Sequence, residues 1–175
     1  MLKRLFKPRA AQIAGRALYL RAVEQAREPA LYAELGAPDT TEGRFELYSL
    51  HVYLLLHRLK GQGPRAAETG QALFDTYVKA LDDALREMGV GDLAVGKRMR
   101  KLGEAFYGRV KSYEEAFTAL PDVTPLEALV RRTVLDGAET PAPGALAQYV
   151  LRQREALAAA PVARLLAGEA DWAAP

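Results

Sequence analysis

Large apolar side chains recur every three or four residues over the stretch from Asp92 to Leu120. With about 100° of rotation per residue in an α-helix, these side chains fall within one narrow arc of the helix surface. The arc consists of Val95, Met99, Leu102, Phe106, Val110, Tyr113, Phe117 and Leu120. A stripe this long is buried only when other helices pack against it. The spacing therefore predicts a long amphipathic helix within an α-helical bundle.

Apolar stripes of the same period, separated by glycine and proline, predict five further helices. The expected helices cover residues 9 to about 28, 40 to about 60, about 65 to 88, a segment that begins near 124, and about 144 to 160. The first carries Ile13, Leu18 and Val23, and the third carries Phe74, Tyr77, Val78, Leu81, Leu85 and Met88. There is no alternating strand pattern and no internal repeat. The sequence predicts an all-α, single-domain helical bundle of about six helices.

Polar residues at three expected helix starts suit N-cap positions, where a side-chain oxygen accepts a hydrogen bond from a free backbone N–H group. Asp39 has Glu42 three residues further on, which is the capping-box spacing. Asp92 precedes the long stripe, and Thr124 precedes Pro125. These residues predict where the second, fourth and fifth helices begin.

The length of 175 residues suits one compact domain. We expect residues 1–35 to form a basic N-terminal segment and the first helix, and residues 36–175 to form the main helical domain. The basic segment suits either the surface of an anionic membrane or a plain solvated terminus. It carries Lys3, Arg4, Lys7 and Arg9, with Leu2, Leu5 and Phe6 between them.

The longest apolar run, VYLLL at residues 52–56, is far too short to span a bilayer. The N-terminal stretch also lacks the apolar core of a secretory signal. These features predict a cytoplasmic protein, with peripheral contact at the inner membrane through the basic segment as an alternative.

Few residue patterns in this chain suit catalysis. The sequence holds no cysteine, and its two histidines, His51 and His57, point to different sides of a helix. Asp82 and Asp83 begin a D-D-x-x-D pattern, but Arg86 stands where the third aspartate of a prenyl-diphosphate site belongs. We therefore expect no metal, no cofactor and no enzyme activity, which leaves a helical enzyme for an isoprenoid or lipid substrate as the weakest interpretation.

The stretch GDLAVGKR at residues 91–98 has the glycine and lysine spacing of a phosphate-binding loop. Such a loop follows a strand and needs Ser or Thr after the lysine to hold magnesium. Here the preceding residues are helical in pattern, and Arg98 follows Lys97. The stretch is better interpreted as a corner between two helices, with Gly89 ending the first.

The second expected helix is apolar on two sides, because Leu47, Leu50 and Leu54 lie opposite its main stripe. Such a helix is either central in the bundle or offers a groove to an apolar partner. Arg44, His51 and Arg58 recur every seven residues on it, and Asp75 and Asp82 recur likewise on the third helix. These charged stripes either form ion pairs at the edge of the core or make a charged rim around a binding surface.

The stretch GKRMRK at residues 96–101 begins the fourth helix with a run of basic residues, among them Arg98 and Lys101. Basic helix ends can bind an RNA backbone, so a ribosome- or RNA-binding module is the alternative function. The net charge of +2 and the nearby glutamates argue against sequence-specific binding to DNA.

Four ordered blocks of the sequence resemble the ubiquinol–cytochrome c chaperone family over roughly residues 36–160. The blocks are G-R-F-E-L…L-H at 43–51, Q-A-L-F-D at 71–75, L-R-E-x-G-V-G-D-L at 85–93, and K-R-M-R-K with A-F-Y-G-R at 97–109. The chain lacks the long N-terminal targeting extension of mitochondrial members, which favours a bacterial member.

The resemblance implies an assembly factor for the cytochrome bc complex rather than an enzyme. Mitochondrial members hold newly made cytochrome b together with a small partner protein near the ribosomal tunnel exit. For this chain the resemblance implies an ATP-independent chaperone with cytochrome b as client, and with the ribosome and a small partner protein as further contacts. The candidate contact residues are Arg44, Leu47, His51, Leu54, Arg58, Arg98, Lys101, Tyr107 and Arg109.

Overall fold

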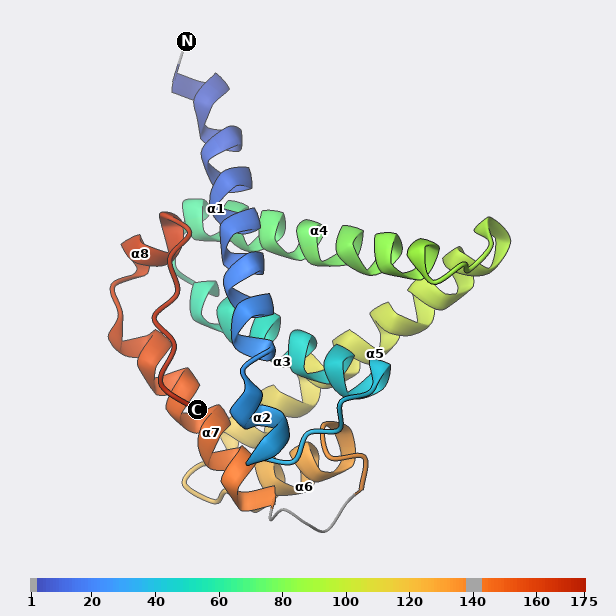
Figure 1. Cartoon of the computed structure of the whole chain (residues 1–175). Coiled ribbons are helices and arrows are strands. Elements are labelled where there is room, and N and C mark those ends of the chain that lie inside the picture. Colours follow the sequence, from blue (N-terminus) through green and yellow to red (C-terminus); the bar gives the residue numbers. More distant parts are fainter. Residues whose placement is uncertain (1–2, 138–142) are drawn as a thin grey trace.

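A computed structural model describes residues 3–137 and 143–175, and for residues 3–9 the backbone alone. These ranges contain helices and no strand, which confirms the predicted all-α bundle (Figure 1). The helices are α1 (Lys3–Ala26), α2 (Pro29–Ala33), α3 (Thr41–Leu59), α4 (Pro64–Glu87), α5 (Asp92–Thr118), α6 (Thr124–Thr133), α7 (Pro143–Ala159) and α8 (Val162–Leu166). The six longer ones correspond to the six predicted helices, and the short α2 and α8 were not predicted.

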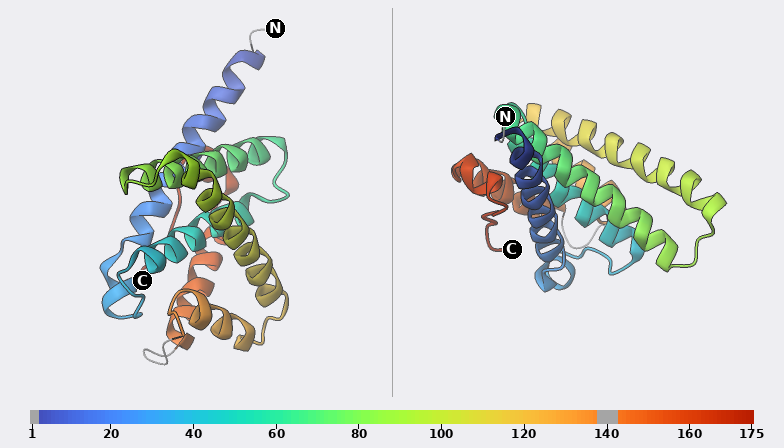
Figure 2. Two further views of the ribbon diagram at one scale, coloured as in Figure 1. Left: turned by 90° about the vertical axis from the view of Figure 1, so that its right-hand side faces the viewer. Right: turned by 90° about the horizontal axis from the view of Figure 1, so that it is seen from above.

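Helix α3 lies at the centre of the bundle and contacts α1, α4, α5, α7 and α8. Helices α1 and α4 cross on one side of it, and α5 runs from the end of α4 towards α6 (Figure 1, Figure 2). The first turns of α1 extend beyond the rest of the molecule in both figures. The corner between α4 and α5 lies at the opposite edge from α7 and α8.

The central position of α3 explains why both of its sides are apolar. Leu47, Leu50 and Leu54 are buried, and so are Val52 and Leu55 on its other side. The interpretation of this segment as a central helix is therefore confirmed. The alternative, an exposed groove formed by Leu47, Leu50 and Leu54, is wrong because neighbouring helices cover these side chains.

Helix α1 packs against α4 at unusually short range. A Cβ atom added at Gly15 would lie 2.6 Å from the backbone nitrogen of Leu73. The buried side of α1 consists of small residues and leucine: Ala14, Leu18, Ala22 and Ala26. Ile13, predicted to share that side, is instead 64% exposed. The small residues, rather than the larger Ile13, let the two helices approach.

The predicted N-caps are wrong by one residue each. Thr40, not Asp39, caps α3 and accepts a hydrogen bond from the backbone N–H of Gly43. Asp92 is the first residue of α5 rather than its cap, which is Gly91. Likewise Val123 precedes α6 as N-cap.

The first two helix boundaries also differ from prediction. Helix α1 begins at Lys3, before Pro8, rather than after it. Helix α1 ends at Ala26, and Pro29 then opens the five-residue α2. A proline at the first helical position needs no N–H partner, so it suits the start of a helix as well as its end.

The stretch at residues 91–98 is a corner between two helices, as predicted. Helix α4 ends at Glu87, Gly89 takes a left-handed φ of 78°, and α5 begins at Asp92. No strand precedes the glycines in this described segment. The phosphate-loop spacing therefore has no phosphate-loop structure.

In residues 3–137 and 143–175 no helix has both the length and the apolar content to cross a membrane. The same ranges hold no group of three or more histidine or carboxylate side chains placed to bind a metal ion.

Candidate functional site

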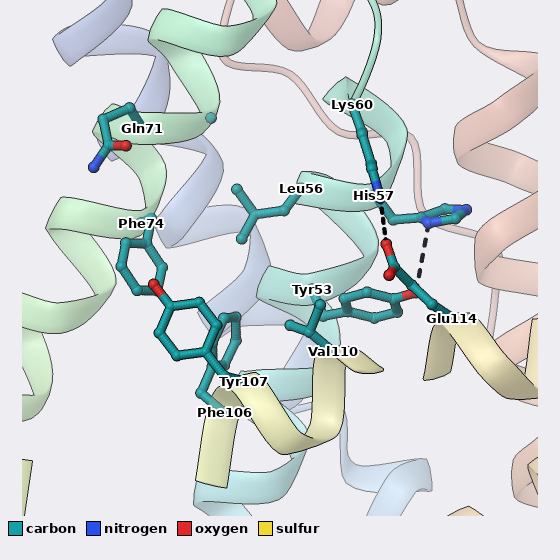
Figure 3. A pocket seen from close by; sticks show the side chains of 11 residues that line it. Tyr53, Leu56, His57, Lys60, Gln71, Phe74, Phe106, Tyr107, Val110 and Glu114 are labelled. Carbon is teal, nitrogen blue, oxygen red and sulfur yellow. Dashed lines mark hydrogen bonds and ion pairs between the residues drawn. The ribbon is translucent and has the colours of Figure 1, made fainter. Parts of the chain in front are cut away.

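A groove opens at the surface between α3, α4 and α5, with a volume of about 360 Å³ (Figure 3). Its lining is mostly apolar and aromatic. The lining residues are Tyr53, Leu56 and His57 of α3, Lys60 at its C-cap, Gly70, Gln71 and Phe74 of α4, and Phe106, Tyr107, Val110 and Glu114 of α5. We call this feature the α3–α4–α5 groove.

Aromatic rings form one side of the α3–α4–α5 groove. The Phe74 ring lies 5.5 Å from that of Phe106 and 6.0 Å from that of Tyr107, measured between centroids. Phe106 is buried, whereas Tyr107 is 62% exposed and stands at the rim. Leu56 and Val110 face the same space from α3 and α5 (Figure 3). This side of the groove offers apolar contact to a ligand without any rearrangement of the core.

Polar groups form the other end of the groove. Lys60 Nζ lies 2.6 Å from Glu114 Oε1, so the two charges neutralise each other across α3 and α5. His57 Nδ1 lies 3.4 Å from the Tyr53 hydroxyl (Figure 3). Partial burial, and then the nearby Arg154 guanidinium, lower the pKa of His57 below its usual range. The groove is therefore close to electrically neutral at pH 7.

The base of the groove rests on the aromatic core. The Tyr53 ring stacks on that of Tyr113 with 5.2 Å between centroids. Gly70 of α4 leaves the floor open, since a Cβ atom there would lie 3.6 Å from a methyl carbon of Leu56. The groove is thus a shallow feature on a well-packed core.

Three of the predicted contact residues lie in the core and not on a surface. Leu47, His51 and Leu54 are each exposed by 1% or less. His51 bonds to the Leu47 carbonyl through Nδ1 and to the Tyr149 hydroxyl through Nε2. Because neighbouring helices cover these three side chains, they cannot contact a client in this conformation, and their assignment to a surface groove is wrong.

The predicted arginines of α3 and α5 bind groups within the protein. Arg44 pairs with Asp39 at 2.6 Å on the surface. Arg58 donates hydrogen bonds to two backbone carbonyls at the end of α7, those of Leu157 and Ala160. These contacts do not form a charged rim, because His51 lies buried between the two arginines.

Arg109 of α5 forms a two-point ion pair with Glu46 of α3. The hydrogen bonds that Arg109 donates to Glu46, outweighing the burial of the guanidinium, raise the pKa of Arg109. This pair holds the two helices together beside the groove, so the structure gives Arg109 a packing role.

The aspartates of α4 do not face the arginines of α3 as one interpretation proposed. Asp82 pairs with Arg86 of its own helix, and Asp75 accepts a hydrogen bond from Gln71. Each carboxylate has its partner four residues away, and side chains at this spacing are neighbours on a helix surface.

Of the remaining predicted residues, Tyr107 alone lines the groove. Arg98 and Lys101 are exposed on another side of α5. The groove residues that sequence reasoning assigned to the core are Phe74, Phe106 and Val110. The sequence did contain one indication of an exposed aromatic residue here. Phe106 and Tyr107 are adjacent, and two adjacent side chains on a helix cannot both face one core.

Comparison with known proteins shows what the chain is similar to. The profile of the family described as ubiquinol-cytochrome C chaperone matches residues 33–172. Ubiquinol-cytochrome-c reductase complex assembly factor 1 of Xenopus laevis is 25% identical over 125 residues, which cover 71% of this chain and 62% of that relative. The crystal structure of the Cbp3 homolog from Brucella abortus superposes with a TM-score of 0.87 at 37% identity, over 99% of this chain and 97% of the other. The match to a bacterial structure agrees with the resemblance found in the sequence.

Proposed function

Because this chain belongs to the ubiquinol–cytochrome c chaperone family, we propose that it is an ATP-independent chaperone that binds newly made cytochrome b during assembly of the cytochrome bc complex. The observation that supports a binding role is the α3–α4–α5 groove, whose apolar lining is open at the surface. The matched relative is named as an assembly factor of the ubiquinol-cytochrome-c reductase complex, and the chain spans 62% of its length.

The size of the groove sets what it can hold. A volume of about 360 Å³ has room for a few apolar side chains rather than for a whole helix. An apolar client helix lying along α5 would insert side chains between Phe74, Leu56 and Val110, with the Tyr107 ring against its edge. This is the helix-in-groove mode of recognition, in which side chains spaced by one turn act as anchors.

Release of the client needs no chemical step in this mechanism. The groove is nearly neutral and its contacts are apolar, so affinity depends on the apolar area that the client buries. A client helix that packs against another subunit or binds its cofactor has less apolar surface to offer. The chaperone then loses its client by competition.

Photo-crosslinking in the native cell tests this function. A benzoylphenylalanine probe at Gln71, an exposed residue on the lip of the groove, is expected to crosslink to cytochrome b. A probe at Glu155, exposed on α7, is the matched control and is expected to give no such crosslink. The absence of cytochrome b from the Gln71 products contradicts the client assignment.

A second variant tests whether the client binds through the groove. Tyr107→Ser removes the exposed ring from the rim and leaves the buried core intact. We expect the crosslink from Gln71 to cytochrome b to weaken severalfold in this variant. An undiminished crosslink would contradict the contact proposed between the client and the Tyr107 ring. The crosslinked products also identify the ribosome or a small partner protein, the further contacts that the family resemblance implies.

A further inference from the structure

The corner between α4 and α5 exposes apolar side chains that no neighbouring element covers. Leu93, in the first turn of α5, is fully exposed, and Met88, next to the end of α4, is 58% exposed. Leu93 lies on the opposite side of α5 from the buried Val95 and Phe106. Exposed in this way, Leu93 and Met88 contribute little apolar burial to the fold and leave an apolar tip at the corner.

Basic residues follow Leu93 at helical spacing on α5. Lys97 and Arg100 lie four and seven residues after it, on the same side of the helix, with Lys101 at the edge of that side and Arg98 further round. All four are exposed, and none forms an ion pair within the described part of the chain. Glu104 is the only acidic residue that follows on this side before Tyr107. The surface therefore combines an apolar tip with a cationic band one to two turns above it.

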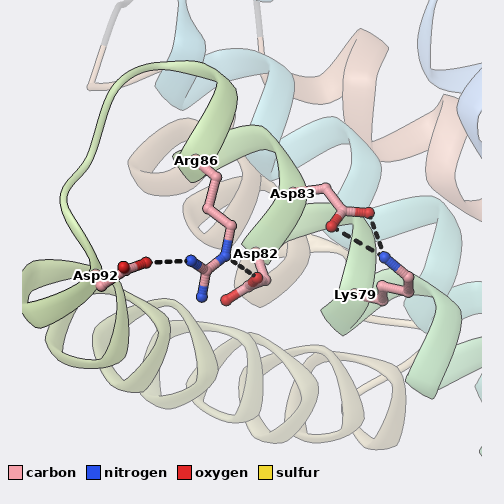
Figure 4. Close-up of polar contacts among 5 residues, drawn as sticks. All are labelled: Lys79, Asp82, Asp83, Arg86 and Asp92. Atoms are coloured by element: carbon pink, nitrogen blue, oxygen red, sulfur yellow. Dashed lines mark hydrogen bonds and ion pairs between the residues drawn. The ribbon is translucent and has the colours of Figure 1, made fainter.

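The acidic side chains at the corner form ion pairs with basic residues of α4. Arg86 at the end of α4 pairs with Asp82 on its own helix and with Asp92 at the start of α5 (Figure 4). Lys79 and Asp83 form a further pair one turn away (Figure 4). These pairs set two cations, Lys79 and Arg86, against the three carboxylates and tie α4 to α5. The ion pair between Arg86 and Asp92 therefore holds the corner that carries Leu93. In this described segment, Glu87 is the nearest carboxylate without a salt bridge.

We propose that the α4–α5 corner docks on the surface of an anionic lipid bilayer. Leu93 and Met88 enter the boundary between headgroups and acyl chains, and Lys97, Arg100 and Lys101 contact the lipid phosphates. The vertical order fits this arrangement, because a rise of about 1.5 Å per residue places the cations roughly 6–12 Å above Leu93. An RNA backbone would bind the cations equally well but gives no reason for an exposed leucine at the tip.

Docking at the corner leaves the α3–α4–α5 groove accessible. Tyr107 is fourteen residues from Leu93 on the same helix, about 20 Å along its axis. The lipid contact needs no client and stands or falls independently of the client assignment. It also differs from contact through the basic N-terminal segment, because the first turns of α1 project from another part of the molecule (Figure 1).

Binding to vesicles of equal parts phosphatidylcholine and phosphatidylglycerol tests the docking surface. The full chain is expected to bind these vesicles and not vesicles of phosphatidylcholine alone. Lys97→Gln with Arg100→Gln is expected to weaken binding about thirtyfold, and Leu93→Ser about tenfold. Arg131→Gln with Arg132→Gln, which removes two exposed charges on α6, and Leu20→Ser on α1 are matched controls expected to bind as the unmodified chain does.

A fluorescent probe decides whether the tip enters the lipid. The chain has no cysteine, so Leu93→Cys gives a single attachment point for an environment-sensitive dye. We expect the emission to shift to the blue on addition of the acidic vesicles, with no shift for the same dye at Leu20→Cys. A dye at position 93 that stays in water while the charge variant loses binding overturns the proposal in favour of a polyanion such as RNA. Insertion of the dye at position 20 instead overturns it in favour of α1.

Discussion

The hydroxyl of Tyr149 in α7 donates a hydrogen bond of 2.7 Å to Nε2 of His51 in α3. The Leu47 carbonyl can only accept, so Nδ1 of His51 carries the proton and Nε2 is the acceptor. Tyr149 in turn accepts a hydrogen bond from the side-chain amide of Gln25 in α1. The chain of hydrogen bonds joins three helices inside the core, and it is complete only while His51 is neutral.

This arrangement predicts a stability that falls in mild acid. Burial lowers the pKa of His51 from 6.5 to about 4, so the unfolded chain takes up a proton at a higher pH than the folded chain does. The unfolding free energy therefore falls as the pH drops from about 6.5 towards 4, by roughly 2 kcal/mol between pH 7 and pH 5 from this one residue. Urea unfolding at the two pH values measures the change.

The variant His51→Gln isolates the contribution of His51 from that of the carboxylates. We expect it to be less stable than the unmodified chain at pH 7, yet to lose about 2 kcal/mol less on going to pH 5. His57→Gln is the comparison for a histidine that is only partly buried. An acid dependence of the same size in His51→Gln and the unmodified chain would assign the effect to other groups.

The single tryptophan reports on how the C-terminal segment is held. Gln153 of α7 bonds to both the N–H and the carbonyl of Ala173, at 2.8 and 2.9 Å. Trp172 beside it packs edge-on against His51, with 5.3 Å between centroids. We expect Gln153→Ala to release this segment, to shift tryptophan emission to the red and to lower the unfolding free energy by about 1–2 kcal/mol.

Gln71→Ala is the matched control for that experiment, because Gln71 is exposed and bonds only within α4. Its emission spectrum is expected to be unchanged. An unshifted spectrum in Gln153→Ala would mean that packing of Trp172, and not the two hydrogen bonds, holds the segment in place.

Two glycines in helices are expected to respond in opposite ways to alanine. Gly15→Ala pushes a methyl group into the backbone of α4 at Leu73, so we expect a loss of about 1–3 kcal/mol. Gly103→Ala places its methyl group in open space on α5 and is expected to gain about 0.5–1 kcal/mol from its higher helix propensity. Thermal unfolding of both variants measures the difference. Equal effects would contradict the close approach of α1 to α4.

The sequence was sufficient for the number and type of long helices, because apolar period and glycine–proline breaks are local signals. It left α3 as either a central helix or one side of an apolar groove, since Val52 and Leu54 lie on opposite sides of one helix. It was not sufficient for the caps. Asp39 and Thr40 both suit the position, and the choice depends on Asp39 finding Arg44 in three dimensions.

The groove could not be predicted because it depends on how far helices diverge. Phe74 and Val110 have the spacing of core residues, and both are partly buried. Whether such a side chain faces a neighbour or a gap depends on the crossing of α4 and α5, which no local pattern encodes. His51 shows the converse, since its place in a charged stripe gave no sign of the uncharged network in which it lies.

The last prediction concerns the pair between Glu46 of α3 and Arg109 of α5. The two guanidinium nitrogens lie 2.7 and 2.8 Å from the two carboxylate oxygens, and the side chains are 12% and 28% exposed. Because the pair is only partly exposed, water screens its charges less than those of a surface pair, but water still reaches it. A double-mutant cycle with Glu46→Gln and Arg109→Gln is expected to give a coupling of about 1–2 kcal/mol.

The exposed pair of Lys79 and Asp83 on α4 provides the comparison, with side chains 75% and 50% exposed. Its geometry is as short, at 2.7 Å, so any difference in coupling reports on burial and on the two-point contact. We expect its cycle to give less than about 0.5 kcal/mol. Equal couplings in the two cycles would contradict the packing role of Arg109. Arg109 would then be one of the surface residues whose charge is available to a binding partner.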